Sequence, residues 1–346
     1  MLASLGRILP SAPIHTLVHR PDQRVRETFR HHTIHASALS ALPGAGRLYQ
    51  LALPVMPDVW RRTRTEATEL VVSSSHAFCK GVDTRGVTHV CYCHTPPRYL
   101  WDLSHEYHGG LSYSLAGPPI RYLRARDRES AEHVDHFIAN SNYVADRIRR
   151  TYGREAKVIY PPVDVDRFVP KEQPRRHFLA GGRLVRYKRV DRAISAANAT
   201  AQPLVVFGDG PDRNRLESMA GPTVRFVGQC SNEQLLDLMH KSIALIFPGV
   251  EDFGILPVEA QAAGTPVVAL GQGGALETVA DGTSGLLYAE DSLACLSDAL
   301  ETTRTQHWNP DDCRRNAERF SRPRFEHEVR VALRDIGFEP DSQFSA

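Results

Sequence analysis

The chain of 346 residues has no apolar run that approaches the roughly 18 residues needed for a membrane-spanning helix. It also has no large excess of charge, because 42 lysines and arginines stand against 40 aspartates and glutamates and leave a net charge of +2. Charge alone therefore does not indicate a nucleic-acid partner. Hydrophobic residues make up 42% and charged residues 24% of the chain, which is typical of a folded protein.

Cysteines are few, and their spacing does not form a metal-binding set. The six cysteines lie at positions 79, 91, 93, 230, 295 and 313. Cys91 and Cys93 alternate along an expected strand and therefore face the same way, but no second pair completes a group of zinc ligands. Free thiols in a reducing cytoplasm are the expected state.

The second half of the chain alternates regularly between short apolar runs and helical stretches. We expect strands at 177–180, 203–207, 224–227, 243–247, 266–270 and 285–288. Helices are expected between them at 190–199, 212–220, 231–240, 255–263 and 275–280. This alternation predicts βαβ units and a parallel sheet.

The first half is also α/β in pattern, but it starts differently. Strands are expected at 13–18, 70–75, 87–94, 136–140 and 157–160. A doubly wound domain normally opens with a strand, a glycine-rich turn and a helix. Here the residues before 13–18 supply only the tail of such a helix, so the first strand of this domain and its glycine turn are missing from the expected pattern.

Two prolines at 161 and 162, followed by a charged stretch as far as Pro174, predict a domain boundary. We expect an N-terminal domain at 1–165 and a second domain at 166–322, both Rossmann-like with parallel sheets. The remaining stretch, 323–346, is expected to contain a last helix. A length of 346 residues suits two domains of ordinary size.

The stretch 243–264 carries the strongest functional signal. An expected strand is followed by a turn that holds Glu251 and by a helix whose first turn holds Glu259. Ligands of open α/β sheets bind beyond the carboxyl ends of the strands, where a helix N-terminus also favours anions. Both acids are expected to face such a cleft. Taken alone, such acids are more often an exposed loop residue and a helix-dipole partner.

A second signal is the string GGRLVRYKR at 181–189, directly after an expected strand. It places Arg183 and Lys188 behind two glycines. An arginine fork and a lysine point charge are suited to a diphosphate leaving group. An ordinary basic loop is the alternative.

Two further positions give weaker signals. Gly273 and Gly274 lie in a glycine-rich loop that would let the backbone approach a ligand closely, with a plain strand–helix turn as the equal alternative. His94 ends the strand expected at 87–94, where it can offer a hydrogen bond to a sugar in a cleft. A lone histidine at such a place is more often an ordinary surface residue.

Together these motifs resemble the retaining glycosyltransferases of family 4, which have the GT-B fold. The strings G-R-L-x-x-x-K at 182–188 and P-P-V-D-x-x-x-F at 161–168 fit that family, and C-H-T-P-x-R-Y-x-W-D at 93–102 resembles its mannosyltransferase-like branch. The E-x7-E element is carried by Glu251, Phe253, Gly254, Pro257, Glu259, Ala260, Gly264 and Pro266.

The resemblance implies a role for each candidate residue. Arg183 and Lys188 would stabilise the diphosphate, Glu251 would lie near the donor sugar, and Glu259 would hold the ribose hydroxyls. His94 would orient the sugar and not act as general base, because the family's front-face attack lets the leaving phosphate take the acceptor proton. The expected donor contacts are completed by Gly182, Phe253, Gly254, Ile255, Gly273 and Gly274.

The resemblance also implies a GT-B architecture, in which two Rossmann-like domains face a cleft and the helix in 323–346 crosses back to the first domain. The implied reaction moves a hexose, with retention, from a nucleotide-diphosphate sugar to a saccharide or lipid-linked saccharide in cell-surface glycan synthesis. GDP-mannose is the favoured donor, and no metal or other cofactor is implied. The expected partners are this donor and a saccharide or glycolipid acceptor, and no nucleic acid.

A basic stretch bears on where the protein works. Arg121, Arg124, Arg126 and Arg128 lie in a helix-prone segment at 117–134. A solvated helix face with acidic partners is the favoured interpretation, and peripheral contact with an anionic membrane that carries the acceptor is the second. We expect a cytoplasmic protein, with the inner face of the cell membrane as the place of such contact.

Two metal interpretations are disfavoured. The histidines at 31, 32 and 35 have no framing carboxylate, so a solvated loop or helix face is favoured there. Asp164 and Asp166 form a D-x-D pattern, but they lie in the string that resembles the crossover between GT-B domains, and those enzymes do not need a metal on the diphosphate.

Two alternatives differ from this function. The first is a catalytically weak or inactive relative that acts as a binding or scaffold subunit, because the N-terminal glycine loop is absent. The second, a GT-B phosphorylase or sucrose-synthase-like enzyme, is disfavoured by the short chain.

The first residues line up with a family pattern in which Met1 takes the place of a valine, so we hypothesise a GTG valine codon read as a start. Mass spectrometry of the native N-terminus tests this, and Met1 as the true first residue would rule it out.

Overall fold

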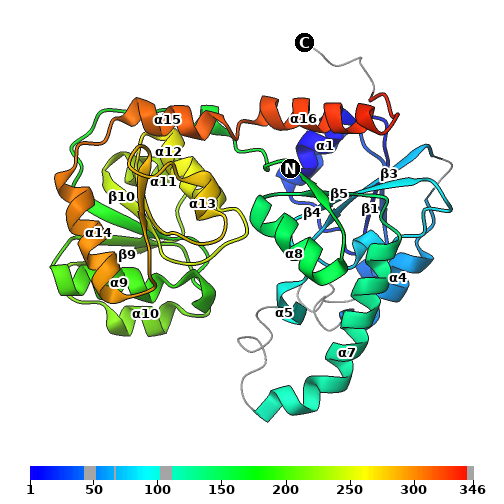
Figure 1. Ribbon diagram of the computed structural model, residues 1–346, viewed down its shortest axis with the longest axis horizontal. Coiled ribbons are helices and arrows are strands. Elements are labelled where there is room, and N and C mark those ends of the chain that lie inside the picture. Colours follow the sequence, from blue (N-terminus) through cyan, green and yellow to red (C-terminus); the bar gives the residue numbers. More distant parts are fainter. Residues whose placement is uncertain (43–51, 66–67, 102–110, 341–346) are drawn as a thin grey trace. The chain divides into compact units, whose positions relative to one another are not determined.

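The computed structural model describes residues 1–42, 52–65, 68–101 and 111–340 (Figure 1). The chain forms two compact units, which we call unit 1 (Met1–Pro161 with Phe325–Ala346) and unit 2 (Pro162–Arg324). Each unit contains a parallel sheet covered by helices. The chain passes from unit 1 to unit 2 at Pro161, slightly before the boundary expected at residue 165.

Unit 1 contains two separate parallel sheets. Strands β3 (Leu70–Ser75), β4 (Thr88–Cys93), β5 (His136–Ala139) and β6 (Ala156–Val158) form one sheet in chain order. Strands β1 (Ile14–Thr16) and β2 (Ile34–Ala36) pair with each other in a second, two-stranded sheet. Within the described residues, β1 and β3 are therefore edge strands.

Helices cover both faces of the four-stranded sheet. Because successive side chains of a strand face opposite ways, Tyr92 packs with α1 (Leu2–Ile8) and α16 (Arg322–Asp335), whereas Cys91 and Cys93 pack with α8 (Asn142–Tyr152). All six cysteines are free, as expected. Burial raises the pKa of the Cys91 thiol well above its usual value. Unit 1 also contains α2 (Gln23–Thr28), η1 (Ala38–Ala41), α4 (Met56–Arg62), η3 (Cys79–Gly81), α5 (Arg98–Trp101) and α7 (Leu111–Glu132).

Unit 2 is built on one six-stranded parallel sheet with the order β12-β11-β10-β7-β8-β9. The chain starts in the middle of the sheet at β7, builds outward through β8 and β9, and then returns to add β10, β11 and β12 on the other side. This is the doubly wound arrangement, and its strand order reverses between β7 and β10. The strands are β7 (His177–Gly181), β8 (Leu204–Phe207), β9 (Val224–Gly228), β10 (Ser242–Phe247), β11 (Val267–Leu270) and β12 (Gly285–Tyr288).

The helices of unit 2 follow the strands in turn and bury the sheet. Residues of β7, β8, β10 and β11 share one core with α9 and α14, and Phe178, Ile194 and Leu300 in that core are completely buried. The helical elements are η4 (Val165–Arg167), η5 (Arg186–Lys188), α9 (Val190–Thr200), α10 (Arg213–Met219), α11 (Asn232–His240), α12 (Ile255–Ala262), α13 (Ala275–Thr278), α14 (Leu293–Thr305) and α15 (Pro310–Glu318).

Three of the four arginines in α7 have partners within unit 1. Arg126 pairs with Asp58 at 2.7 Å, Arg124 donates a hydrogen bond to the carbonyl of Leu100, and the guanidinium of Arg128 lies over the ring of Trp101. These contacts support the interpretation of a helix face with local partners. Among the described helices, none combines the length and the apolar character required to traverse a lipid bilayer.

Replacing Phe325 with alanine should destabilise unit 1 through α16. Phe325 is completely buried and its ring meets that of Tyr92 edge to face, with centroids 5.7 Å apart. A Phe→Ala change in a core costs about 3–5 kcal/mol. Urea unfolding should show this loss for Phe325→Ala, and His327→Ala on the exposed side of the same helix should change the free energy of unfolding little. Equal effects of the two substitutions would contradict the placement of α16.

Candidate functional site

The candidate site of unit 2 lies at the carboxyl ends of β7 and β10. These strands are neighbours in the sheet, and the strand order reverses between them. In open α/β sheets this point is where the loops part and a ligand can enter. The predicted residues Gly182, Arg183 and Lys188 follow β7, and Glu251 to Glu259 follow β10.

Lys188 and Glu251 form an ion pair at this point. The ammonium of Lys188 donates to a carboxylate oxygen of Glu251 at 2.5 Å, and the two side chains are 18% and 20% exposed. The close approach of the loops that carry Lys188 and Glu251 depends on Gly249, because a Cβ there would lie 2.8 Å from the carbonyl oxygen of Tyr187. A cation and an acid are thus held together and remain partly accessible to a ligand.

The glycine loop after β11 also contacts the loop that carries Glu251. The amide of Gly274 donates to the carbonyl of Glu251 at 2.8 Å, and a side chain at Gly274 would collide with the backbone of Phe253. Gly273 also approaches the carbonyl of Glu251 closely and has a left-handed φ of 63°. The two glycines therefore shape the loop that carries Glu251, and their contact with a donor stays a prediction.

The start of α12 presents backbone to the site. The Phe253 side chain is buried against the ring of Phe320, with centroids 5.4 Å apart, so only its backbone is available to a ligand. Gly254 precedes the helix with a φ of 90°, and Ile255 is 48% exposed. This arrangement is compatible with the expected use of the amides of these three residues.

Arg183 is the exposed cation of the group. It lines a cavity of about 690 Å³ together with Gly182, the turn from Phe207 to Gly210, Gln229 and Cys230. In the part of the chain that the structure describes, it makes no ion pair with an acid. A Cβ on neighbouring Gly182 would lie 3.8 Å from the ammonium of Lys188, so this backbone runs close to the ion pair.

Glu259 lies in α12 and is half-buried. Burial raises its pKa to about 7; nearby Asp164 acts in the same direction and Arg167 opposes it. Near neutral pH this acid therefore exists in both protonation states. A carboxyl group that is partly protonated can both donate hydrogen bonds to the hydroxyls of a ligand and accept hydrogen bonds from them.

Arg314 holds the crossover segment beside this acid. Its guanidinium donates to the carbonyls of Val165 at 2.6 Å and Phe168 at 2.9 Å, and it pairs with Asp166 at 3.2 Å. Sequence reasoning missed both Arg314 and Arg167. No local pattern could link an arginine in α15 to a segment about 150 residues earlier in the chain.

The remaining predicted residue, His94, belongs to unit 1. It follows β4, its Nε2 lies 3.0 Å from the hydroxyl of Ser74, and its ring meets Tyr92 edge to face. Burial, helped by the charges of His76 and the terminal amino group, lowers the pKa of His94 to about 4. The imidazole is therefore neutral at physiological pH, and its role in orienting a sugar stays a prediction. Asp102, the last residue of the string that begins at Cys93, lies outside the described residues.

Comparison with known proteins identifies the class. Residues 164–320 match the family model described as Glycosyl transferases group 1, and residues 5–167 match the one described as Glycosyltransferase Family 4. The two matches meet at the crossover between the units. With a Rossmann-like parallel sheet in each unit, they support the GT-B fold that the motifs predicted.

Curated relatives cover part of the chain. D-inositol 3-phosphate glycosyltransferase 1 of Catenulispora acidiphila is 32% identical over an alignment of 212 residues, and the match covers 49% of this chain and 51% of that protein. The D-inositol 3-phosphate glycosyltransferase of Mycolicibacterium smegmatis is 29% identical over an alignment of 209 residues, and the match covers 53% of this chain and 48% of that protein. The chain thus spans about half the length of the curated relatives it matches.

Solved structures support the fold over nearly the whole chain. Sucrose-phosphate synthase from Thermosynechococcus elongatus has a TM-score of 0.70 at 18% identity, with 93% of this chain and 86% of that one covered. Anabaena Alr3699/HepE in complex with UDP and glucose has a TM-score of 0.65 at 18% identity, with 96% and 95% covered. None of the proteins named here is called a mannosyltransferase, so that branch stays a prediction.

The raised pKa of Glu259 predicts that nucleotide affinity depends on pH. If the ionised carboxylate accepts the ribose hydroxyls, affinity should increase as pH rises through about 7 and the ionised fraction grows. Between pH 6 and pH 8 that fraction grows about tenfold, which sets the upper limit of the effect. Calorimetric titration with UDP and GDP measures it. Glu259→Gln is the matched control, because it retains the titration of the phosphates. A pH profile shared by both proteins would refute the role of Glu259.

Proposed function

We propose that the protein is a retaining glycosyltransferase that takes a sugar from a nucleotide-diphosphate donor bound by unit 2. The observation that carries this proposal is the Lys188–Glu251 ion pair at the reversal point of the sheet. Exposed Arg183 and half-buried Glu259 follow the same two strands. Phosphate oxygens prefer the two cations as partners, and sugar hydroxyls prefer the two acids.

Donor binding exchanges the partners of the ion pair. Diphosphate oxygens accept hydrogen bonds from Lys188, and Glu251 then accepts from a hydroxyl of the donor sugar. The bond between the anomeric carbon and the phosphate oxygen breaks with its electron pair on the oxygen, and the acceptor oxygen bonds to the same face of the sugar. The leaving phosphate takes the acceptor proton. Arg183 and Lys188 stabilise the charge that grows on the diphosphate during this step.

The donor and acceptor are proposed more specifically. GDP-mannose is the first donor to test, because the string from His94 to Tyr99 resembles mannosyltransferases. UDP-glucose is the second, since one solved structure of Alr3699/HepE is in complex with it. A saccharide or lipid-linked saccharide is the proposed acceptor, and D-inositol 3-phosphate joins the panel because the curated relatives carry its name. Cytoplasmic location and peripheral membrane contact stay predictions.

A binding or scaffold role is the second candidate function. One observation favours it: the unit 1 sheet is divided between β1 and β3, on the side of the fold where His94 lies. Under this alternative, unit 2 would bind a nucleotide sugar without transfer.

A donor panel decides between the two candidates. GDP-mannose, GDP-glucose, UDP-glucose and UDP-galactose are incubated with the protein, with and without acceptors, and release of UDP or GDP is measured beside calorimetric binding. Nucleotide release that requires an acceptor supports the transferase. Binding of UDP or GDP without release from any donor supports the binding role, and absence of both would refute the assignment of unit 2.

Arginine substitutions test the catalytic assignment of Arg183. Arg183→Ala should lower turnover by about 10²–10³-fold, because removing one group that stabilises charge in the transition state has an effect of this size in other enzymes. Arg186→Ala is the matched control, because Arg186 is also exposed and lies in the same loop. Thermal melting of both variants shows whether they remain folded. Equal loss of turnover in the two variants would count against a specific role for Arg183.

A further inference from the structure

The basic string after β7 contains one residue with a strained backbone. Arg189 has a φ of 53° and a ψ of 34°, in the left-handed region that glycine adopts easily and other residues seldom adopt. Among the non-glycine residues that the structure describes, Arg85 and Ala201 are the two others with a positive φ. Strain of this kind persists where the surrounding structure enforces it, and it is frequent at functional sites. Here it lies directly after Lys188, a residue of the candidate site.

The backbone of Arg189 joins the short helix η5 to the helix α9. Its amide donates to the carbonyl of Arg186 at 3.0 Å, and its carbonyl accepts from the amide of Arg192 at 2.9 Å. The helix α9 is fixed against the sheet, and its Ile194 is completely buried. The φ and ψ of Arg189 therefore set the direction in which η5, with Lys188 at its end, leaves that helix.

The backbone of Lys188 has little room to adjust. A Cβ at Gly249 would lie 2.9 Å from the Cα of Lys188, so the loop after β10 touches this backbone. The amide of Lys188 donates to the carbonyl of Val185 at 3.1 Å, which closes the turn. A different conformation at Arg189 would change this turn. The ammonium of Lys188 would then lose its present place at Glu251.

The side chain of Arg189 is held by an acid from a distant part of the chain. Asp291, which follows β12, accepts a hydrogen bond from the guanidinium of Arg189 at 2.8 Å. The same carboxylate pairs with Arg192 at 3.1 Å, in the first turn of α9. Asp191 lies farther from Arg189, at 3.8 Å. One carboxylate thus connects the strained residue to the helix that follows it.

The strain and the contact are comparable in size. The left-handed conformation lowers the population of a non-glycine residue roughly five- to thirtyfold. Arg189 and Asp291 are 35% and 33% exposed, and an ion pair that water reaches in this way contributes up to about fivefold. Because the contact is made in the left-handed conformation, it offsets part of the strain.

We infer that Arg189 is a positioning residue: its contact with Asp291 holds the left-handed turn that places Lys188. The turn thereby keeps the Lys188 ammonium at Glu251. In the proposed function, on which the role of Lys188 rests, the same turn keeps this ammonium at the diphosphate. The guanidinium of Arg189 is occupied by Asp291. The basic string is thus divided between residues that bind the diphosphate, Arg183 and Lys188, and one that positions.

Two substitutions separate the backbone of Arg189 from its side chain. Arg189→Ala and Arg189→Gly both remove the contact with Asp291, but only glycine adopts the left-handed turn without strain. Arg189→Ala should lower kcat, measured with a donor that is active in the panel, on the order of tenfold. It should also make the amide of Lys188 exchange with solvent about tenfold faster. Arg189→Gly should stay within about threefold of the unmodified protein in both readouts. A side chain that only anchors the loop would give equal effects in the two variants.

Asp291→Asn tests the anchor. Alone, it should lower kcat about fivefold. Combined with Arg189→Gly, it should add no further loss, because the turn no longer depends on the contact. Glu290→Gln is the matched charge control, since Glu290 is the exposed acid next to Asp291. Ala201→Gly is the matched strain control, since Ala201 has a φ of 52° at the other end of α9. Neither control should change kcat or the exchange of the Lys188 amide.

Two results would overturn the inference. Equal losses of kcat in Arg189→Ala and Arg189→Gly would mean that the guanidinium itself acts on the ligand. Equal exchange of the Lys188 amide in these variants would mean that the turn does not place Lys188. If Arg189→Ala does not fold in a thermal melt, Asp291→Asn with and without Arg189→Gly gives the same comparison.

The exchange measurement needs no nucleotide sugar and therefore separates this inference from the proposed function. Slower exchange of the Lys188 amide in Arg189→Gly than in Arg189→Ala supports the positioning role even if no donor is turned over. Absence of turnover with every donor would count against the proposed transfer and not against the turn.

Discussion

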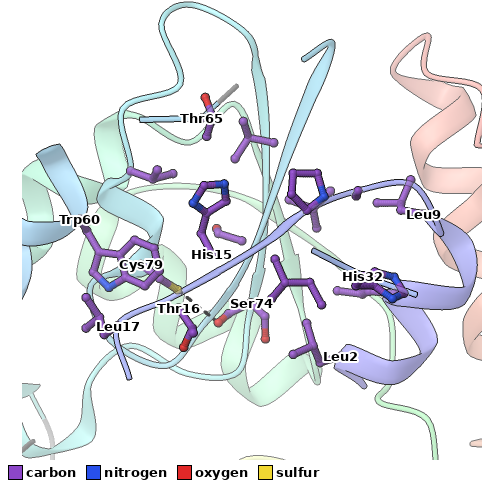
Figure 2. Close-up of a pocket in the computed structure, with 18 of the residues that line it drawn as sticks. Leu2, Leu9, His15, Thr16, Leu17, His32, Trp60, Thr65, Ser74 and Cys79 are labelled. Carbon is purple, nitrogen blue, oxygen red and sulfur yellow. Dashed lines mark hydrogen bonds between the residues drawn. The ribbon is translucent and has the colours of Figure 1, made fainter. Parts of the chain in front are cut away.

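A parallel β-strand needs hydrogen bonds on both edges and cover on both faces, and the two units meet this requirement to different degrees. In unit 2, β7 and β10 lie inside a six-stranded sheet, and their apolar side chains are almost entirely buried. The loops that leave these strands are consequently anchored at a fixed place. In unit 1, the sheet is divided between β1 and β3, and a cavity of about 1380 Å³, lined by apolar side chains together with His15, His32 and His76, lies at the division (Figure 2).

The fixed ends of β7 and β10 explain how two acids of one loop–helix segment acquire different properties. Glu251 has a cation at 2.5 Å, whereas burial dominates the surroundings of Glu259 and raises its pKa to about 7. Two carboxyl groups that lie in such different environments usually have different roles as well. In the proposed reaction, Glu251 exchanges Lys188 for a sugar hydroxyl, and Glu259 accepts the ribose hydroxyls in its ionised form, which grows as pH rises through about 7.

Much of unit 2 could be predicted from the sequence because its strands are continuous apolar runs separated by amphipathic stretches. The pairing of Lys188 with Glu251 could not, since 63 residues separate them and the contact depends on the close approach permitted by Gly249. Sequence reasoning also missed β2, which consists of Ile34, His35 and Ala36 within a polar, histidine-rich segment. The ring of His35 instead stacks on that of His15 across the β1–β2 pair, with centroids 4.9 Å apart.

Unit 2 has one continuous six-stranded sheet, whereas the sheet of unit 1 is divided between β1 and β3. The residues proposed for donor binding and those proposed for transfer therefore lie on sheets of different completeness. Every contact that we assign to the diphosphate and the ribose comes from unit 2, whose sheet has β7 paired on both edges. His94, which is expected to orient the sugar, is hydrogen-bonded to Ser74 at the ends of β3 and β4, next to the divided edge. Ser74 itself lines the cavity, so a change in the order of that edge reaches His94 through one hydrogen bond.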